Sequence, residues 1–358
     1  MIGEVPVIDA VVHSYNFDPS NYANEFAKPL AELVWGANYE LSGRGYKIPK
    51  QGYLRDWSVE ETASMVFLES DTDLAVYHVL PINAFADGCV SLEKACQVKE
   101  RWPDRFVVYA GVDPLQGPAA LEELQRQVEI LDPIGLKLYP NSWATGNFGA
   151  WKMDDPEVAF PVFERARQLG IKVIAIHKAV PLGPVPIEHY KMDDIDRAAI
   201  AFPDLIFEVV HGGMAFVEES AWQIARFSNV YLNLEITTAL AAVRPAAFQH
   251  VLQVLLSVGG ETAIERILWG TGAMAFHPQP HLEAFWRFQF PPEVVEGYGV
   301  PQLTIEAKRK ILAENYARMV GLDLAERLSR IRDDDFGRRR REGRAAPYST
   351  TAVAGMVE

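Results

Sequence analysis

The sequence predicts a closed (β/α)8 TIM barrel, and two patterns point to this fold. Short runs rich in Val, Ile and Leu alternate with longer stretches whose apolar residues recur at helical spacing. The short runs are apolar on both faces, as in the strands of a parallel sheet that helices cover. Eight such units in order favour a barrel over an open doubly wound sheet, which usually has fewer strands.

Eight segments carry the strand pattern, and a helical pattern occupies seven of the eight stretches that follow them. Gly170 follows one of these helical stretches, at the position where a helix commonly ends. The expected strands span residues 5–13, 73–80, 105–113, 134–140, 171–178, 206–213, 230–235 and 267–272.

Two segments depart from the repeat. Residues 14–72 form a long first connection rich in Tyr, Asn, Gly and Trp, so we expect an inserted lid that lines a substrate pocket or a subunit interface. Residues 326–358 are charge-blocked and then small and polar, without helical or strand period. They are expected to be a disordered tail or an arm that contacts another subunit. The barrel itself is expected within residues 1–325.

Composition excludes several classes of partner. Hydrophobic residues make up 49% of the chain and the net charge is −14, which favours a globular protein and disfavours a nucleic-acid partner. No apolar run approaches the roughly 18 residues that cross a bilayer. Cys89 and Cys96 have neither disulfide nor zinc-knuckle spacing. We therefore expect a cytoplasmic protein that acts on a small molecule and binds neither nucleic acid nor membrane.

Several polar residues fall where the expected strands end. His13, His177 and His211 end the first, fifth and sixth strands, and Asn233 and Glu235 end the seventh. The carboxyl ends of barrel strands meet at one mouth, where the chemistry of such enzymes takes place. A lone histidine there is more often structural, but three at equivalent heights favour a metal site or an acid–base site.

The motifs at these strand ends resemble those of a known family. The resemblance covers roughly residues 5–325 and points to the amidohydrolase superfamily, in the branch with aminocarboxymuconate semialdehyde decarboxylase. It implies a hydrolase or decarboxylase that holds a divalent metal, often zinc, in the barrel mouth. The motifs that carry it are VIDAVVH, GLKLYP, AIHK, VVHGG, NVYLNLE, WGTGAMAFHP and KRKILAENYARMVGLD.

The resemblance also implies which residues do the chemistry, and two positions depart from it. Family members bind metal through H-x-H on the first strand, His on the fifth and Asp on the eighth. Here Val11 replaces the first histidine and Gly272 replaces the aspartate, so only His13 and His177 remain as ligands. The sixth-strand acid–base residue is retained as His211. Two imidazoles are fewer than the three or four protein ligands that zinc prefers.

Substitute metal ligands are Glu235 and His277, with His281 a weaker candidate expected to open the next helix. Glu235 has a second interpretation as a buried, hydrogen-bonded carboxylate. One interpretation of Lys137 is that it corresponds to the metal-bridging lysine of two-metal amidohydrolases, although its motif is common in the single-metal branch. Asp9 is expected to be a structural hydrogen-bond acceptor.

Two hypotheses about function follow. The first is a degenerate subunit that pairs with an intact amidohydrolase-like chain, resembling the less complete chain of the two-chain 2-aminoisobutyrate hydroxylase. The alternative is a self-sufficient mononuclear hydrolase or decarboxylase acting on a small carboxylate, lactone or amide. In both cases we expect one divalent metal, zinc, that is weakly held or absent. The first hypothesis requires a paralogous partner or self-association for activity.

Overall fold

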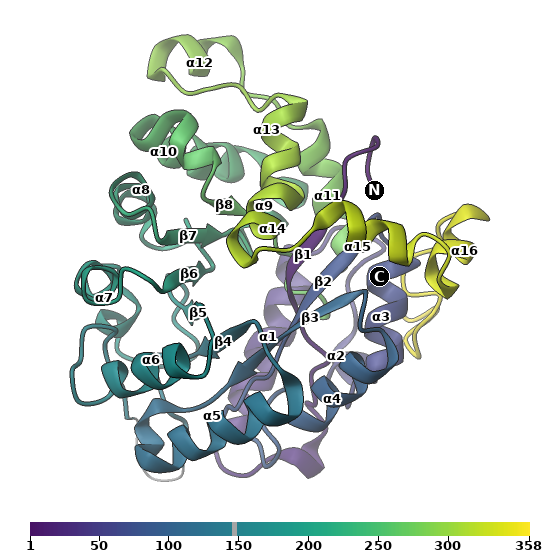
Figure 1. The fold of residues 1–358 in the computed structure, drawn as a ribbon. Coiled ribbons are helices and arrows are strands. Elements are labelled where there is room, and N and C mark those ends of the chain that lie inside the picture. Colours follow the sequence, from purple (N-terminus) through teal and green to yellow (C-terminus); the bar gives the residue numbers. More distant parts are fainter. Residues whose placement is uncertain (145–148) are drawn as a thin grey trace.

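Eight parallel strands form the barrel that the sequence predicts. The computed structural model describes residues 1–144 and 149–358. Neighbouring strands pair in chain order, and Figure 1 shows helices surrounding them. Hydrogen bonds from Ala10 N to Trp269 O and from Gly272 N to Val11 O, both 3.0 Å, join the first strand to the last. The strands are β1 (Ile8–Val12), β2 (Leu74–His78), β3 (Phe106–Gly111), β4 (Gly135–Leu138), β5 (Val173–His177), β6 (Ile206–Val210), β7 (Val230–Asn233) and β8 (Ile267–Leu268).

The helices cover the outside of the barrel, and local signals fix several of their starts. A capping box between Ser58 and Glu61 begins α3, and Ser91 caps α4. None of the helices in the described ranges is long and apolar enough to cross a membrane. The α-helices are α1 (Ala27–Leu41), α2 (Lys50–Tyr53), α3 (Val59–Phe67), α4 (Leu92–Arg101), α5 (Pro118–Leu131), α6 (Ala159–Gln168), α7 (Ile195–Ala201), α8 (Val217–Arg226), α9 (Thr237–Val243), α10 (Pro245–Ile264), α11 (Pro278–Arg287), α12 (Pro292–Tyr298), α13 (Ile305–Arg309), α14 (Asn315–Val320), α15 (Leu324–Ile331) and α16 (Asp335–Arg341).

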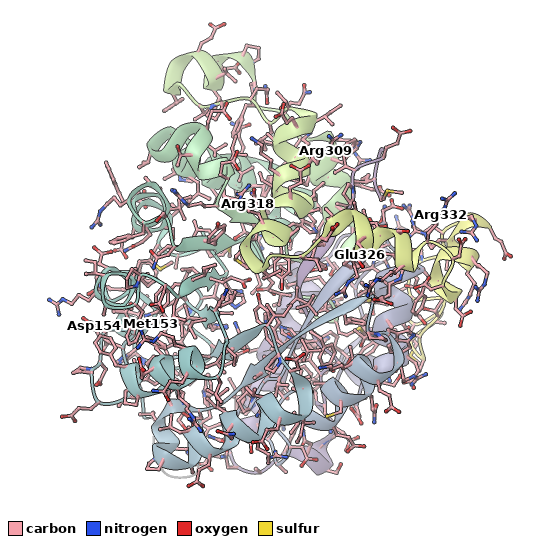
Figure 2. All side chains as sticks on the ribbon, in the orientation of Figure 1. Met153, Asp154, Arg309, Arg318, Glu326 and Arg332 are labelled. Atoms are coloured by element: carbon pink, nitrogen blue, oxygen red, sulfur yellow. The ribbon has the colours of Figure 1, made fainter. Side chains whose placement is uncertain are left out.

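The barrel interior contains polar groups that satisfy one another. Glu208 accepts hydrogen bonds from Asn233 Nδ2 at 2.6 Å and from the Tyr109 hydroxyl at 3.0 Å. Asp9 accepts from the backbone and the hydroxyl of Thr271, as expected for a structural acceptor. Figure 2 shows side chains filling the interior of the barrel. These buried carboxyls therefore have hydrogen-bond partners, which a buried polar group requires.

The inserted segment covers the carboxyl ends of the strands. It supplies α1, α2 and α3, and the apolar face of α1 presents Leu33, Val34 and Ala37 to a cavity in the barrel mouth. The segment therefore forms part of a pocket wall, one of the two arrangements that its composition predicts.

The C-terminal residues fold back onto the same chain and form a short helix, although their sequence has no helical period. Asp334 caps α16 through the amide of Gly337 and pairs with Arg105, while Phe336 is buried. Figure 1 shows α16 beside α3. The arginine run lies near acidic residues, and Arg340 forms an ion pair with Asp71. A helix cap and one buried aromatic thus order a segment whose composition suggests disorder.

One buried carboxylate holds the last residues in place. Glu69 accepts hydrogen bonds from the amides of Tyr348 (2.6 Å) and Thr350 (2.7 Å), and from the Thr350 hydroxyl. It also lies 3.1 Å from Nε2 of His277. We call residues 343–358 the C-terminal strap. Its final residue pairs with the inserted segment, because Glu358 N donates to Lys47 O at 3.0 Å.

We predict that Glu69→Ala releases the C-terminal strap and lowers the free energy of unfolding by about 2–3 kcal/mol. The reason is that several buried donors lose their acceptor at once. Denaturant unfolding measures the loss, and limited proteolysis measures the release of residues 343–358. Glu122→Ala, an exposed position on α5, is the matched control and should change neither. Equal protease resistance of the strap in both variants would contradict this role for Glu69.

Candidate active site

A cavity of about 240 Å³ lies in the barrel mouth, at the carboxyl ends of the strands. Its floor carries His13 after β1, Lys137 in β4, His177 at the end of β5, His211 after β6 and Glu235 after β7. All five side chains are buried. The predicted strand-end residues His13, His177, His211 and Glu235 therefore do meet in one place, as a barrel requires.

His177 and His211 are hydrogen-bonded to each other, and their protons can be assigned. Nε2 of His177 lies 2.7 Å from the carbonyl oxygen of Val180, which only accepts, so Nε2 is the donor. Nδ1 of the same neutral ring is then an acceptor, and it lies 2.8 Å from Nε2 of His211. His211 therefore donates through Nε2. Its Nδ1 is left facing Oε2 of Glu235, with which it makes a close pair.

Burial favours the neutral forms of both Glu235 and His211, and so determines which of the two side chains carries the proton between them. Burial raises the pKa of Glu235 to about 8, although the ammonium of Lys137 lowers it. Burial and the same ammonium lower the pKa of His211 well below its usual value, although a hydrogen bond to the backbone of Glu235 raises it. At neutral pH we therefore infer a protonated Glu235 beside a neutral His211. The usual order of acidity for these two side chains is inverted, as is common at catalytic sites.

The backbone at His211 has a strained conformation, and this conformation sets the direction of the imidazole ring. His211 has φ 69°, a left-handed conformation that non-glycine residues rarely adopt. Gly213 lies two residues later with φ 82°, where the chain turns toward α8. A Cβ at Gly213 would lie 2.6 Å from Val251 on α10, so the turn also needs a residue without a side chain. Strain of this kind is concentrated at functional sites.

The backbone of Gly272 and the carboxyl group of Glu235 lie against each other in the barrel mouth. Gly272 has φ 67°, and a Cβ built on it would overlap Oε1 of Glu235. The Glu235 carboxyl therefore lies where the side chain of an aspartate at position 272 would begin. The sequence identifies both residues as unusual, but only the structure shows that the absence of one side chain makes room for the other.

Lys137 lies on the cavity floor, a role that sequence analysis did not predict. Burial lowers the pKa of its ammonium to about 8, while Glu235 and Glu208 raise it. Nζ lies 5.0 Å from the ring centre of Tyr139, within cation–π range. The available signal was a charged residue in the middle of an otherwise apolar strand.

The mouth offers few donors for the one weakly held metal ion that the resemblance implies. In the part of the chain that the structure describes, no three His, Cys, Asp or Glu side chains are placed to hold a metal ion. Nδ1 of His13 is buried without a partner, and both ring nitrogens of His177 already have one. The donor set is thus short of the three protein ligands that zinc sites need.

The two histidines after β8 lie outside the cavity. His277 caps α11 through the amide of Gln279 and pairs with Glu69 under the C-terminal strap. His281 lies near the start of that helix, which begins at Pro278. Neither residue lines the barrel mouth. Cys89 does line it, but burial raises the pKa of its thiol, which disfavours the nucleophilic thiolate.

Comparison with known families assigns the chain. A model of the amidohydrolase family matches residues 73–322, which include seven of the eight strands and four of the five residues on the cavity floor. The chain belongs to the amidohydrolase family. A search of curated protein sequences finds no match to it.

Solved structures confirm the fold of this amidohydrolase. An uncharacterised TIM-barrel protein from Bordetella bronchiseptica has a TM-score of 0.61 at 19% identity, over 88% of this chain and 99% of that one. The 5-carboxyvanillate decarboxylase of Sphingomonas paucimobilis has a TM-score of 0.52 at 15% identity, over 89% and 100%. A dihydroxybenzoic acid decarboxylase from Polaromonas, solved with bound manganese, has a TM-score of 0.54 at 14% identity, over 89% and 99%.

We predict that Gly272→Ala lowers the free energy of unfolding by about 1–3 kcal/mol, because its Cβ displaces the carboxyl of Glu235. The loss should be smaller in a Glu235→Ala background, where the overlap is gone, so a double-mutant cycle by denaturant unfolding measures the coupling. Gly36→Ala, in α1 with open space around the position, is the control. The same loss in both backgrounds would show that position 272 and Glu235 do not compete for space.

Proposed function

We propose that this amidohydrolase-family chain is an enzyme that decarboxylates a small apolar carboxylic acid, with Glu235 and His211 as its acid–base pair. The close pair of Glu235 and His211 at the floor of the cavity is the observation that carries the proposal, and burial, which raises the pKa of Glu235, favours the protonated acid. Decarboxylation breaks the bond between carbon and the carboxylate, and the carbon then needs a proton. A buried carboxylic acid that is still protonated at neutral pH suits that step.

The proposed reaction balances without a co-reactant. The bond to the carboxylate breaks, CO₂ leaves, and its electron pair stays on the substrate carbon. Glu235 supplies the proton that forms the new C–H bond and becomes a carboxylate beside His211. The chain from His211 through His177 to Val180 holds the imidazole in one orientation, and a proton from solvent restores the acid.

The cavity walls support this chemistry. Most of the lining is apolar, with Leu33, Val34 and Met214 among the residues above the floor. Apolar walls favour an apolar substrate body and the neutral CO₂ that leaves. Two solved structures with the same fold are decarboxylases by name, and this likeness supports the reaction class through the fold alone. Hydrolysis of a small carboxylate substrate uses the same pair and is the related alternative.

No step of this proposal passes through a metal ion. The manganese of the Polaromonas structure belongs to that protein. In this chain Val11 and Gly272 occupy the positions where the resemblance implies two further ligands, and Glu235 faces His211. One zinc ion at His13 and His177 stays a prediction from the resemblance.

The missing ligands favour a second candidate function. In it, the chain is a degenerate subunit, and activity requires a paralogous amidohydrolase-like chain that carries the complete ligand set. The absence of three placed donors in the described part of the mouth supports this candidate. The intact pair of His211 and Glu235 in a formed cavity favours the first one, because a purely structural subunit has no need of an inverted acid–base pair.

We predict that the purified chain alone decarboxylates at least one acid in a panel of small aromatic and branched aliphatic carboxylic acids. Glu235→Gln and His211→Asn should each lower kcat by roughly 10²–10⁴-fold, the usual contribution of a positioned acid–base group. Release of CO₂ and substrate NMR measure turnover, and circular dichroism checks folding. His250→Asn, at an exposed position of α10, is the matched histidine control.

Unchanged turnover in Glu235→Gln would contradict the acid–base assignment. No turnover of any acid by the chain alone, with activity gained on adding a paralogous chain, would favour the degenerate subunit.

A further inference from the structure

Among the described residues that line the cavity, Lys137 is the one Lys or Arg. The other basic residues there are His13, His177 and His211, and the rings of His177 and His211 are hydrogen-bonded to each other. A negatively charged ligand that enters the mouth therefore meets a single ammonium group, and it meets that group at the floor.

The ammonium of Lys137 has no hydrogen-bond or ion-pair partner among residues 1–144 and 149–358, although its residue is 1% exposed. The nearby carboxyls are already engaged, because Glu208 accepts from Asn233 and Tyr109, and Glu235 faces His211. A buried ammonium has three donors to satisfy, and leaving them unsatisfied is costly.

The other deeply buried lysine of the barrel mouth shows what a structural role looks like. Nζ of Lys178 donates to Asp194 Oδ2 at 2.6 Å and to the carbonyl of His189 at 2.7 Å, and none of its surface is exposed. Lys178 is therefore a paired, stabilising residue. Lys137 differs from Lys178 because its side chain faces a cavity and lacks such partners. A buried polar group usually has a hydrogen-bond partner, so a ligand in the cavity would supply the one that Lys137 lacks.

The surroundings of Lys137 restrict the ligand. The ring of Tyr139 lies beside Nζ, and apolar residues of α1 and of the segment 180–182 form the walls above. A ligand with several charges would bury some of them against these walls without partners. A compact acid with one carboxylate and an apolar body meets both requirements, and it fits a cavity of about 240 Å³.

We propose that Lys137 is the anchor for the carboxylate of a small apolar monocarboxylic acid, which it holds at the cavity floor beside Glu235. This inference rests on the proposed function, because it names the substrate class of the same site. The anchor acts on affinity and orientation: it places the acid so that its apolar body fills the mouth. Lys137 thus determines specificity for an anion over a neutral molecule of the same shape.

The test compares benzoate with its neutral isostere benzamide by isothermal titration calorimetry on the full chain. We expect the wild type to bind benzoate at least about tenfold more tightly than benzamide, as a charge-assisted hydrogen bond implies. Lys137→Met, which keeps the length and apolar stem of the side chain, should remove this preference and leave benzamide binding unchanged. Lys152→Met, at a partly exposed position with a surface partner, is the matched lysine control.

Two outcomes overturn the inference. One is equal affinity of the wild type for benzoate and benzamide, which needs no variant to fold. The other is a Lys137→Met chain that is folded by circular dichroism and still prefers benzoate. With the acid that is turned over, Lys137→Met should raise KM by at least about tenfold and change kcat less, in contrast to Glu235→Gln.

The anchor and the proposed function fail in different ways. Binding of benzoate that depends on Lys137, without turnover of any acid, would support the anchor and contradict the decarboxylase. Turnover that depends on Glu235, with binding and KM unchanged in Lys137→Met, would contradict the anchor and leave the decarboxylase standing.

Discussion

The junction between the first and last strands determines both the fold and the site. Backbone hydrogen bonds from Ala10 to Trp269 and from Gly272 to Val11 close the barrel and draw the segment after β8 across its mouth. Because position 272 has no side chain, the backbone passes close to Glu235 and leaves the carboxyl room beside His211. Without closure the strand ends would spread apart, and without this glycine the carboxyl would have to move.

Much of the fold is predictable from the sequence for a simple physical reason. Barrel strands lie between the packed interior and the outer helices, so most of their residues on both faces are apolar, and residues 171–178 and 206–213 stand out from the amphipathic stretches between them. A parallel barrel then places the last residue of each strand at the same mouth. His177 and His211 are therefore predicted neighbours, and they are hydrogen-bonded in the structure.

The rest of the site depends on contacts between segments far apart in sequence, which periodicity does not contain. Lys137 has the same sequence context whether it bridges metals, pairs with a carboxylate or faces a cavity. His277 lies only a few residues beyond β8, yet capping α11 turns its ring toward Glu69 and away from the mouth. The C-terminal strap is likewise held in place by the buried carboxylate of Glu69, which lies more than 270 residues earlier in the chain than Tyr348.

We infer that His177 and His211 are neutral imidazoles in a chain that ends on a protonated Glu235. The most direct measurement is ¹⁵N NMR of histidine-labelled protein at neutral pH, with the two rings assigned through single His→Asn variants. We expect both rings to carry one proton, on Nε2, and Nδ1 of His211 to show the shift of a nitrogen accepting a hydrogen bond. A doubly protonated His211, a proton on Nδ1 of His177, or the shift of a metal-bound nitrogen in either ring would contradict it.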